Sequence, residues 1–245
     1  MTRNIKLVLE YDGTKYFGWQ QQPDKITIQE CLKTSINKLT REDVKVHGAG
    51  RTDTGVHAYG QVANFHTDSR IPDWAFTKAI NAFLPPDIVV RESQEVPSEF
   101  HAQYSAKAKS YSYRMICRPI RPAIEARYAH WISHPLNLDA IKNSTQYLIG
   151  THDFSSFEAT NSPRKSSVRT VNYVDIVQES CYIKFLIEAD GFLYHMVRNI
   201  VGTLLSVGRS QIDAAGFQRI VAAKDRAAAG PTVPAKGLFL ECVKY

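Results

Sequence analysis

The stretch around which the fold can be interpreted is His47-Gly48-Ala49-Gly50-Arg51-Thr52-Asp53-Thr54-Gly55-Val56-His57. Its glycines tolerate positive φ and let the backbone approach other backbone or a ligand closely. The loop presents a carboxylate, Asp53, two residues after the guanidinium of Arg51. Because a nearby cation favours the ionised form of a carboxyl group, Asp53 suits a nucleophile or a base better than an acid. The simpler interpretation is a polar turn between two strands.

The glycine spacing excludes two common phosphate-binding loops. Gly48-Ala49-Gly50 lacks the third glycine of the dinucleotide-binding fingerprint. Gly50 and Gly55 are spaced as in a P-loop, but Val56-His57 follows where that loop has Lys and then Ser or Thr. Neither type of nucleotide cradle is therefore expected.

The sequence on both sides of this loop predicts a β-α-β-β-α-β order for the first half of the chain. Alternating apolar residues indicate strands, and the capping box Thr27-Ile28-Gln29-Glu30 marks the start of a helix. Expected strands cover residues 5–11, 44–46, 59–65 and 88–96, and expected helices cover residues 28–39 and 73–84. Asp53 therefore lies at a junction between two strands.

The second half repeats the same order. Expected strands cover residues 107–116, 171–177, 182–189 and 237–243, and expected helices cover residues 137–149, 194–207 and, as an addition, 213–223. We therefore predict an α+β protein of two ferredoxin-like halves, residues 1–103 and 104–245. Their sheets could join into one mostly antiparallel sheet with a central active-site cleft between the halves. Single-stranded RNA readers use the same order of elements.

Composition points to a basic globular protein. The formal net charge of +6 over 245 residues favours a polyanionic partner such as nucleic acid. The four cysteines are far apart and form no CxxC pair, so we expect neither a zinc site nor a disulfide framework, and reduced thiols in a cytosol fit best. We expect no signal peptide and no membrane span.

Two further groups of residues suit nucleic acid. In the strand over residues 107–116, cations and aromatic rings alternate onto one face: Lys107, Lys109, Tyr111, Tyr113 and Met115. Lysine would bind phosphate and tyrosine would stack on a base, although half-buried strand residues show the same pattern. The sequence has two basic loops, at residues 118–122 and 163–165. Their side chains either contact phosphates or are solvated surface charges.

A polar stripe is predicted on the helix over residues 194–207. It contains His195, Arg198, Asn199 and Gly202, spaced at i, i+3, i+4 and i+7. Arg198 could pair with Asp53 from this stripe, although an arginine on such a helix is usually surface charge.

The stretch Gly50-Arg51-Thr52-Asp53-Thr54-Gly55-Val56-His57-Ala58 closely resembles the motif GRTDxGVHA of the tRNA pseudouridine synthase A family. Further matches follow in order: Tyr11-Asp12-Gly13-Thr14, Phe17-Gly18-Trp19-Gln20, Phe100-His101-Ala102, Tyr111-Ser112-Tyr113, Gly150-Thr151-His152-Asp153-Phe154 with Ser156-Phe157, Met196-Val197-Arg198-Asn199 and Gly237-Leu238-Phe239-Leu240. The chain departs from the family at Gln103, where Arg is typical, and at Lys109-Ser110, where two basic residues are usual.

The resemblance implies a cytoplasmic homodimer that isomerises uridine to pseudouridine at positions 38, 39 and 40 in the anticodon stem and loop of tRNA. It implies no cofactor and no metal. By the resemblance, Asp53 is the catalytic aspartate and Arg51 the arginine linked to base flipping. Tyr111 is the stacking tyrosine, Arg198 the ion-pair partner of Asp53, and Leu238 an apolar wall of the pocket.

The expected reaction requires a uridine that has left its stack. Asp53 would promote departure of the uracil, either by attack at C1′ or by removal of the 2′ proton. A catalytically silent RNA-binding module of the same fold is the first alternative. A hydrolase of N-glycosidic bonds is the second, but it would need another carboxylate to activate water, and the loop offers only Asp53.

Overall fold

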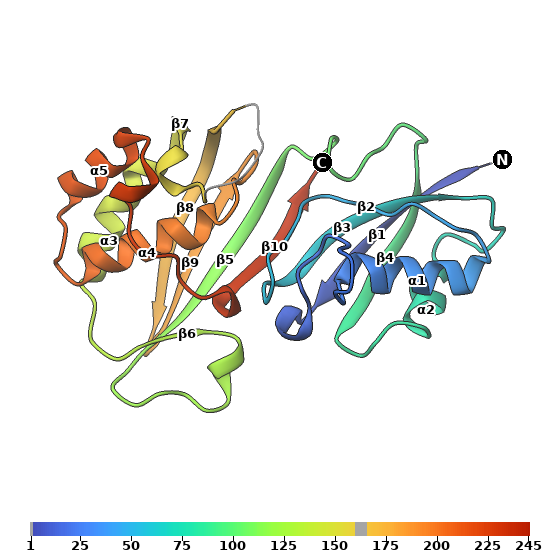
Figure 1. Ribbon diagram of the computed structural model, residues 1–245, viewed down its shortest axis with the longest axis horizontal. Helices are drawn as coiled ribbons and strands as arrows, with labels where there is room; N and C mark the ends of the chain where they lie inside the picture. The colour runs from blue at the N-terminus through green and yellow to red at the C-terminus, as the bar shows by residue number, and fades with distance from the viewer. Residues whose placement is uncertain (1, 160–165) are drawn as a thin grey trace. The chain divides into compact units, whose positions relative to one another are not determined.

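The computed structural model describes residues 2–159 and 166–245, which form a mixed α+β protein with mostly antiparallel strand pairing. The predicted fold class is confirmed. The chain divides into two compact units, Met1–Lys107 with Phe239–Tyr245 and Ala108–Leu238, called here unit 1 and unit 2 (Figure 1). Within the described residues, none of the helices is both long enough and apolar enough to cross a membrane.

Unit 1 is built on a sheet in the strand order β4-β1-β3, with β2 and β10 both on the outer side of β3. Its elements are β1 (Arg3–Tyr11), α1 (Ile28–Thr40), β2 (His47–Gly48), β3 (His57–Thr67), α2 (Ala75–Asn81), β4 (Ile88–Val96) and the final strand β10 (Leu238–Lys244). The pairs of β1 with β3, β1 with β4 and β2 with β3 are antiparallel. β10 runs parallel to the start of β3, with Phe239 opposite His57. The β-α-β-β-α-β order predicted for the first half is confirmed.

The core of unit 1 forms where α1 covers one face of this sheet (Figure 1). The Thr27 side chain accepts the Glu30 backbone N–H, as the capping box predicts, and begins the helix. The helix ends at Arg41, which adopts a left-handed conformation with φ +63°. This core includes six fully buried side chains: Ile5, Leu7 and Leu9 of β1, and Ile28, Leu32 and Ile36 of α1.

The strand predicted at residues 44–46 is wrong, although Val44 and Val46 are both buried as the alternation suggests. Side chains of α1 take the backbone groups that a strand would need. The Asn37 Oδ1 atom accepts the Val44 N–H at 3.1 Å, and the Gln29 Nε2 atom donates to the Val46 carbonyl at 2.9 Å. The ladder with β3 therefore begins only at His47.

The helix predicted at residues 73–84 is shorter than expected. Ser93 of β4 lies at its start, where its hydroxyl donates to the Asp73 carbonyl at 2.6 Å and accepts the Thr77 N–H at 3.0 Å. These are the two groups that would otherwise form the first bond of a longer helix. At the other end, Phe83 and Leu84 both donate to the Ile80 carbonyl and close the helix with a turn.

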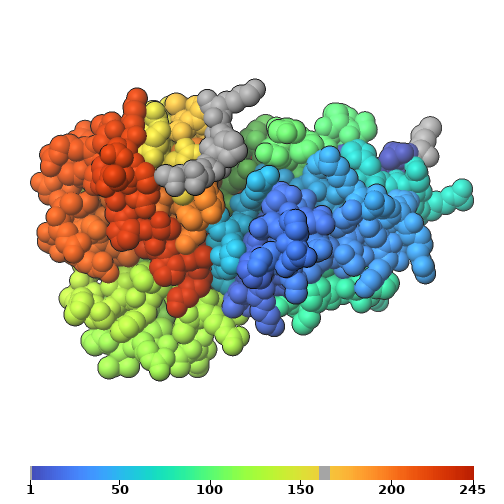
Figure 2. Space-filling view, in the orientation of Figure 1, coloured from blue at the N-terminus to red at the C-terminus, as the bar shows by residue number. Residues whose placement is uncertain are grey.

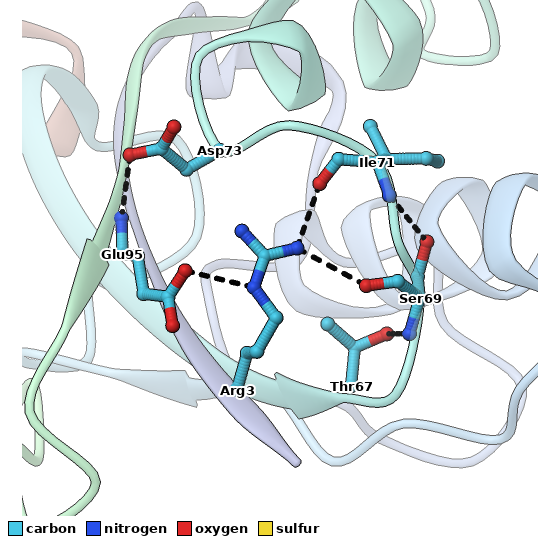
Figure 3. A network of polar contacts seen from close by, with 6 residues as sticks. All are labelled: Arg3, Thr67, Ser69, Ile71, Asp73 and Glu95. Atoms are coloured by element: carbon cyan, nitrogen blue, oxygen red, sulfur yellow. Dashed lines mark hydrogen bonds and ion pairs between the residues drawn. The ribbon is translucent and has the colours of Figure 1, made fainter. Parts of the chain in front are cut away.

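Arg3 fixes the segment between β3 and α2 (Figure 3). Its Nε atom donates to Glu95 of β4 at 2.8 Å. Its Nη1 atom donates to the carbonyls of Ser69 at 3.1 Å and Ile71 at 2.8 Å. The Asp73 carboxylate accepts the Glu95 N–H at 3.2 Å, so one end of β4 and the segment leading into α2 are held together.

Unit 2 is built on a sheet in the order β5-β9-β8-β7, all of whose neighbours are antiparallel. Its elements are β5 (Ala108–Cys117), β6 (His130–Ile132), α3 (Leu138–Thr145), β7 (Gly150–Asp153), β8 (Val168–Glu179), β9 (Tyr182–Ala189), α4 (Met196–Gly208) and α5 (Ala214–Ala223). The short β6 runs parallel to β5. The main strands and helices match the prediction, whereas β6 and β7 were not predicted.

The core of unit 2 lies between α4 and one face of this sheet (Figure 1). Ile183, Phe185 and Ile187 of β9 are buried, and the residues that alternate with them are only half-buried. Ile200 and Leu204 are among the buried residues of α4.

The segment between β5 and β6 extends away from the helices of unit 2, and its atoms form the lower edge of that unit in Figure 2. Arg118 and Arg121 of the first predicted basic loop are exposed there. The second predicted basic loop, residues 163–165, lies outside the described residues.

Candidate functional site

Residues 49–56 connect β2 to β3 and carry Asp53 at the predicted junction. Asp53 is half-buried, and Arg51 is exposed. Thr52 is buried: its Oγ1 atom lies 2.8 Å from the Tyr11 hydroxyl, and its carbonyl accepts the Trp19 N–H at 3.0 Å. The Asp53 carbonyl accepts the Val56 N–H at 3.1 Å. The backbone on both sides of the Asp53 side chain is therefore held in place.

Glycines outside the loop allow the chain to pack closely against it. A Cβ added at Gly13 would lie 2.0 Å from the Val56 carbonyl oxygen. One added at Gly18, which has φ +82°, would lie 2.5 Å from the Thr52 carbonyl oxygen. No side chain larger than hydrogen fits at either position without a shift of the backbone. The segment after β1 is thus pressed against the loop that presents Asp53.

Glycines inside the loop behave as predicted at two positions. Gly48 faces the Trp19 indole, which a Cβ would approach to 2.4 Å. Gly55 has φ +78°, the left-handed conformation that glycine adopts readily. The Gly50 carbonyl accepts a hydrogen bond from Nε2 of the buried Gln61 at 2.9 Å. This polar loop is therefore tied to the sheet at several points.

His57 anchors the end of the loop. Its side chain is 1% exposed, and its Nδ1 atom accepts the Gly13 N–H at 3.1 Å. The same atom lies 3.1 Å from the Asp12 carboxylate. On the other side, the imidazole stacks on the Phe239 ring with centroids 4.7 Å apart.

The tyrosines predicted on β5 are both buried. The Tyr111 ring contacts Phe192 edge to face at 4.9 Å. Tyr113 is fully buried, and its hydroxyl donates to the Pro234 carbonyl at 2.7 Å. Burial raises the pKa of Tyr113, and the positive charge of Arg198 opposes that shift. Tyr113 is thus a core residue, which confirms the simpler interpretation for this position.

Three residues of the predicted polar stripe lie on α4 and face the segment before β10, whereas His195 precedes the helix in a left-handed conformation. The Arg198 Nε atom donates to the Val233 carbonyl at 2.9 Å. A Cβ at Gly202 would lie 1.7 Å from the Pro231 carbonyl oxygen, so the predicted close approach is present. The fully buried Asn199 donates to the Phe157 carbonyl and accepts the Thr232 hydroxyl. Asn199 and Gly202 therefore position a neighbouring segment.

The predicted site residues fall into two groups. Arg51 and Asp53 lie on the loop of unit 1. Tyr111, Arg198 and Leu238 belong to unit 2, where the segment 233–238 contacts Arg198 through the Val233 carbonyl and β5 through Tyr113. Leu238, at the end of this segment, is buried.

Sequence reasoning from the loop alone missed the residues that hold it. These are Tyr11, Gly13, Gly18 and Trp19. The available signal was the pair of family matches Tyr11-Asp12-Gly13-Thr14 and Phe17-Gly18-Trp19-Gln20. Within residues 2–159 and 166–245, no three His, Cys, Asp or Glu side chains form a group that could hold a metal ion.

Fold and site together define a class: an α+β protein that presents one aspartate on a tightly packed loop between two strands of a mostly antiparallel sheet. The family model described as tRNA pseudouridine synthase matches residues 7–105 and 145–245, and the chain belongs to that family.

Named relatives align over almost the full chain. It is 46% identical to the tRNA pseudouridine synthase A of Clostridium acetobutylicum over 243 residues, which are 99% of this chain and 100% of that protein. It is 47% identical to the tRNA pseudouridine synthase A of Acetivibrio thermocellus, with the same coverage. A solved structure described as an archaeal box H/ACA sRNP Nop10-Cbf5 complex is 15% identical, with a TM-score of 0.38 over 82% of this chain and 43% of that one.

Proposed function

We propose that this chain isomerises uridine to pseudouridine at positions 38, 39 and 40 in the anticodon stem and loop of tRNA. Membership of the tRNA pseudouridine synthase family supports the reaction and the substrate. The observation that carries the proposal in the structure is the packed loop around Asp53, whose neighbours Thr52 and Val56 are both held by the segment at residues 13–19. The protein acts as a cytoplasmic homodimer, without cofactor or metal.

In this proposal Asp53 is the essential catalytic residue. Arg198 is the ion-pair partner that the family resemblance implies for its carboxylate. Arg51 takes the place of the flipped uridine in the stack. Tyr111 stacks on the freed uracil, and Leu238 forms an apolar wall of the pocket.

The reaction exchanges one bond for another within the same nucleotide. The C1′–N1 bond breaks, the uracil turns, and C5 bonds to C1′, while C5 loses its hydrogen and N1 gains one. Asp53 promotes departure of the uracil by attack at C1′ or by removal of the 2′ proton. Both routes need an ionised carboxylate, which an arginine partner favours.

The proposal is tested by incubating the protein with unmodified tRNA and mapping pseudouridine by reverse transcription after carbodiimide treatment. We expect stops that report positions 38, 39 and 40 with wild type and with the control Asp24→Asn, an exposed aspartate of unit 1. We expect none with Asp53→Asn. Absence of stops with wild type, or release of free uracil, would overturn the proposed reaction.

A further inference from the structure

Three aromatic side chains lie against one another on unit 1, and none of them has a role in the proposed reaction. Tyr104 is 79% exposed, and its ring lies on the His101 imidazole with centroids 4.3 Å apart and planes inclined by 29°. The His101 imidazole in turn contacts His47, with centroids 4.6 Å apart and planes inclined by 55°, so only the Tyr104–His101 pair is stacked. His47 begins the strand that leads into the Asp53 loop.

Hydrogen bonds fix His101, the middle ring of the three. The His101 Nδ1 atom accepts the backbone N–H groups of Gln103 at 3.1 Å and Tyr104 at 3.4 Å. With Nδ1 as the acceptor, the network places the hydrogen of a neutral His101 on Nε2, which lies 3.2 Å from the His47 Nδ1 atom and donates to it.

Hydrogen bonds also fix the backbone of residues 101–105. His101 and Ser105 close a turn, in which the Ser105 N–H donates to the His101 carbonyl at 2.9 Å and the His101 N–H donates to the Ser105 hydroxyl. The fully buried Asn64 accepts the Ala102 N–H at 2.9 Å, and the Tyr245 hydroxyl donates to the Ala102 carbonyl at 2.8 Å. An exposed tyrosine is thus held on an ordered turn, with one ring face against His101.

We propose that Tyr104 is a stacking platform for an unpaired base of tRNA other than the reacting uridine. The choice of tRNA rests on the proposed function. Every nucleobase has a face that stacks on an aromatic ring, and a ring that is already ordered loses little entropy when a base binds. Exposed Lys45 precedes His47 by two residues and exposed Lys107 follows Tyr104 by three, and in this proposal they bind the phosphates that flank the base.

The first test is equilibrium binding of an unmodified tRNA transcript, measured by filter binding without turnover in an Asp53→Asn background. Removing one stacked base contact is expected to weaken binding about 5- to 150-fold for Tyr104→Ala. Tyr104→Phe keeps the ring and should bind within about twofold of its parent. The matched control is Trp74→Ala, because Trp74 is another aromatic residue of unit 1 and is 73% exposed. Its binding should also stay within about twofold.

The second test measures base stacking at position 104 by fluorescence. A Tyr104→Trp variant places an indole on the platform, and its fluorescence should be quenched by tRNA beyond the change seen with the unsubstituted protein. His101→Ala removes the support below the ring and should weaken tRNA binding in the same direction as Tyr104→Ala.

The outcomes separate this inference from the proposed function. Unchanged tRNA binding by Tyr104→Ala, in a protein that forms pseudouridine, would overturn the inference alone. A Tyr104→Ala variant that changes the mass of the protein in solution but not its tRNA affinity would assign the surface to contacts between copies and would also overturn it. A wild type that forms no pseudouridine but binds tRNA through Tyr104 would overturn the proposed function and leave the inference standing.

Discussion

At the scale of single residues, the position of Asp53 depends on glycines that lie far from it in the sequence. Gly18 combines a left-handed backbone with a close approach to the Thr52 carbonyl, the peptide group immediately before Asp53. A side chain at position 18 therefore requires either a new backbone conformation or a displaced loop.

We predict that Gly18→Ala lowers the free energy of unfolding of unit 1 by about 2 kcal/mol or more, through backbone strain and steric clash. Catalysis should fall with it, because the displaced Thr52 moves Asp53. The control Gly216→Ala lies in α5, where the nearest atom to an added Cβ is the Asp213 carboxylate oxygen that caps the helix, at 3.0 Å. Its stability should change by less than about 1 kcal/mol. Urea unfolding measures the free energy of unfolding of both variants. Equal stability of Gly18→Ala and Gly216→Ala would contradict the packing described for Gly18.

A second prediction concerns His130 of β6. Burial lowers the pKa of His130, and the positive charges of Lys236 and Arg209 lower it further. The unfolded imidazole therefore binds a proton more readily than the folded one, so stability is lost as the pH falls through the ordinary value of 6.5. His130→Gln should show a smaller loss of stability between about pH 7.5 and pH 5.5 than wild type. The control is His134→Gln, an exposed position, which should lose as much stability over this pH range as wild type. If His130→Gln also loses as much stability as wild type, the prediction is wrong.

At the scale of elements, the connection from β3 to α2 is held by side chains rather than by regular structure. Arg3 of β1 reaches both the carbonyls of this connection and a carboxylate of β4 (Figure 3). Loss of its guanidinium would leave two carbonyls and Glu95 without these bonds.

We expect Arg3→Ala to lower the free energy of unfolding by about 1–2 kcal/mol, a modest value because the pair with Glu95 is partly exposed. The released segment contains Arg70, so limited trypsin digestion should cut after Arg70 faster than in wild type. Lys33→Ala removes the exposed ion pair with Asp43 and should change neither quantity measurably. Unchanged digestion of Arg3→Ala would show that the connection does not depend on this network.

The elements that were predicted correctly have a hydrophobic period that continues for several residues. β4 was predicted at residues 88–96 and β9 at residues 182–189, and both match the structure. β6 and β7 are only three and four residues long, too short to show a period. The strand expected at residues 44–46 and the start of α2 were wrong for another reason. Side chains of distant elements take their backbone hydrogen bonds, and no local pattern reports such contacts.

The candidate site shows the same division. The glycines and the charge pattern identified the Asp53 loop from the sequence, and its place between two strands is confirmed. The partners that fix the loop, such as Tyr11 and Gly18, come from another segment and are visible only in three dimensions. For Tyr113, strand alternation could not distinguish a buried core ring from a ring available to a base.

For the whole molecule, the net charge of +6 favours binding to the phosphates of tRNA. Binding to phosphates releases counterions, so affinity should fall linearly with salt on a double logarithmic scale. We predict that raising monovalent salt from about 50 mM to about 200 mM weakens tRNA binding at least about tenfold, as a few phosphate contacts require. A parallel series with Trp74→Ala should have the same slope. Affinity independent of salt would contradict binding through basic residues.

If the Asp53 carboxylate drives the isomerisation, release of hydrogen from C5 of uridine reports its effect directly. A tRNA carrying tritium at C5 of uridine loses it to water only when C5 bonds to C1′. In a single turnover, we predict that wild type and Asp24→Asn release tritium at the same rate. Asp53→Asn should release it at least about a thousandfold more slowly while still binding tRNA. Release by Asp53→Asn within tenfold of the wild-type rate would contradict the account.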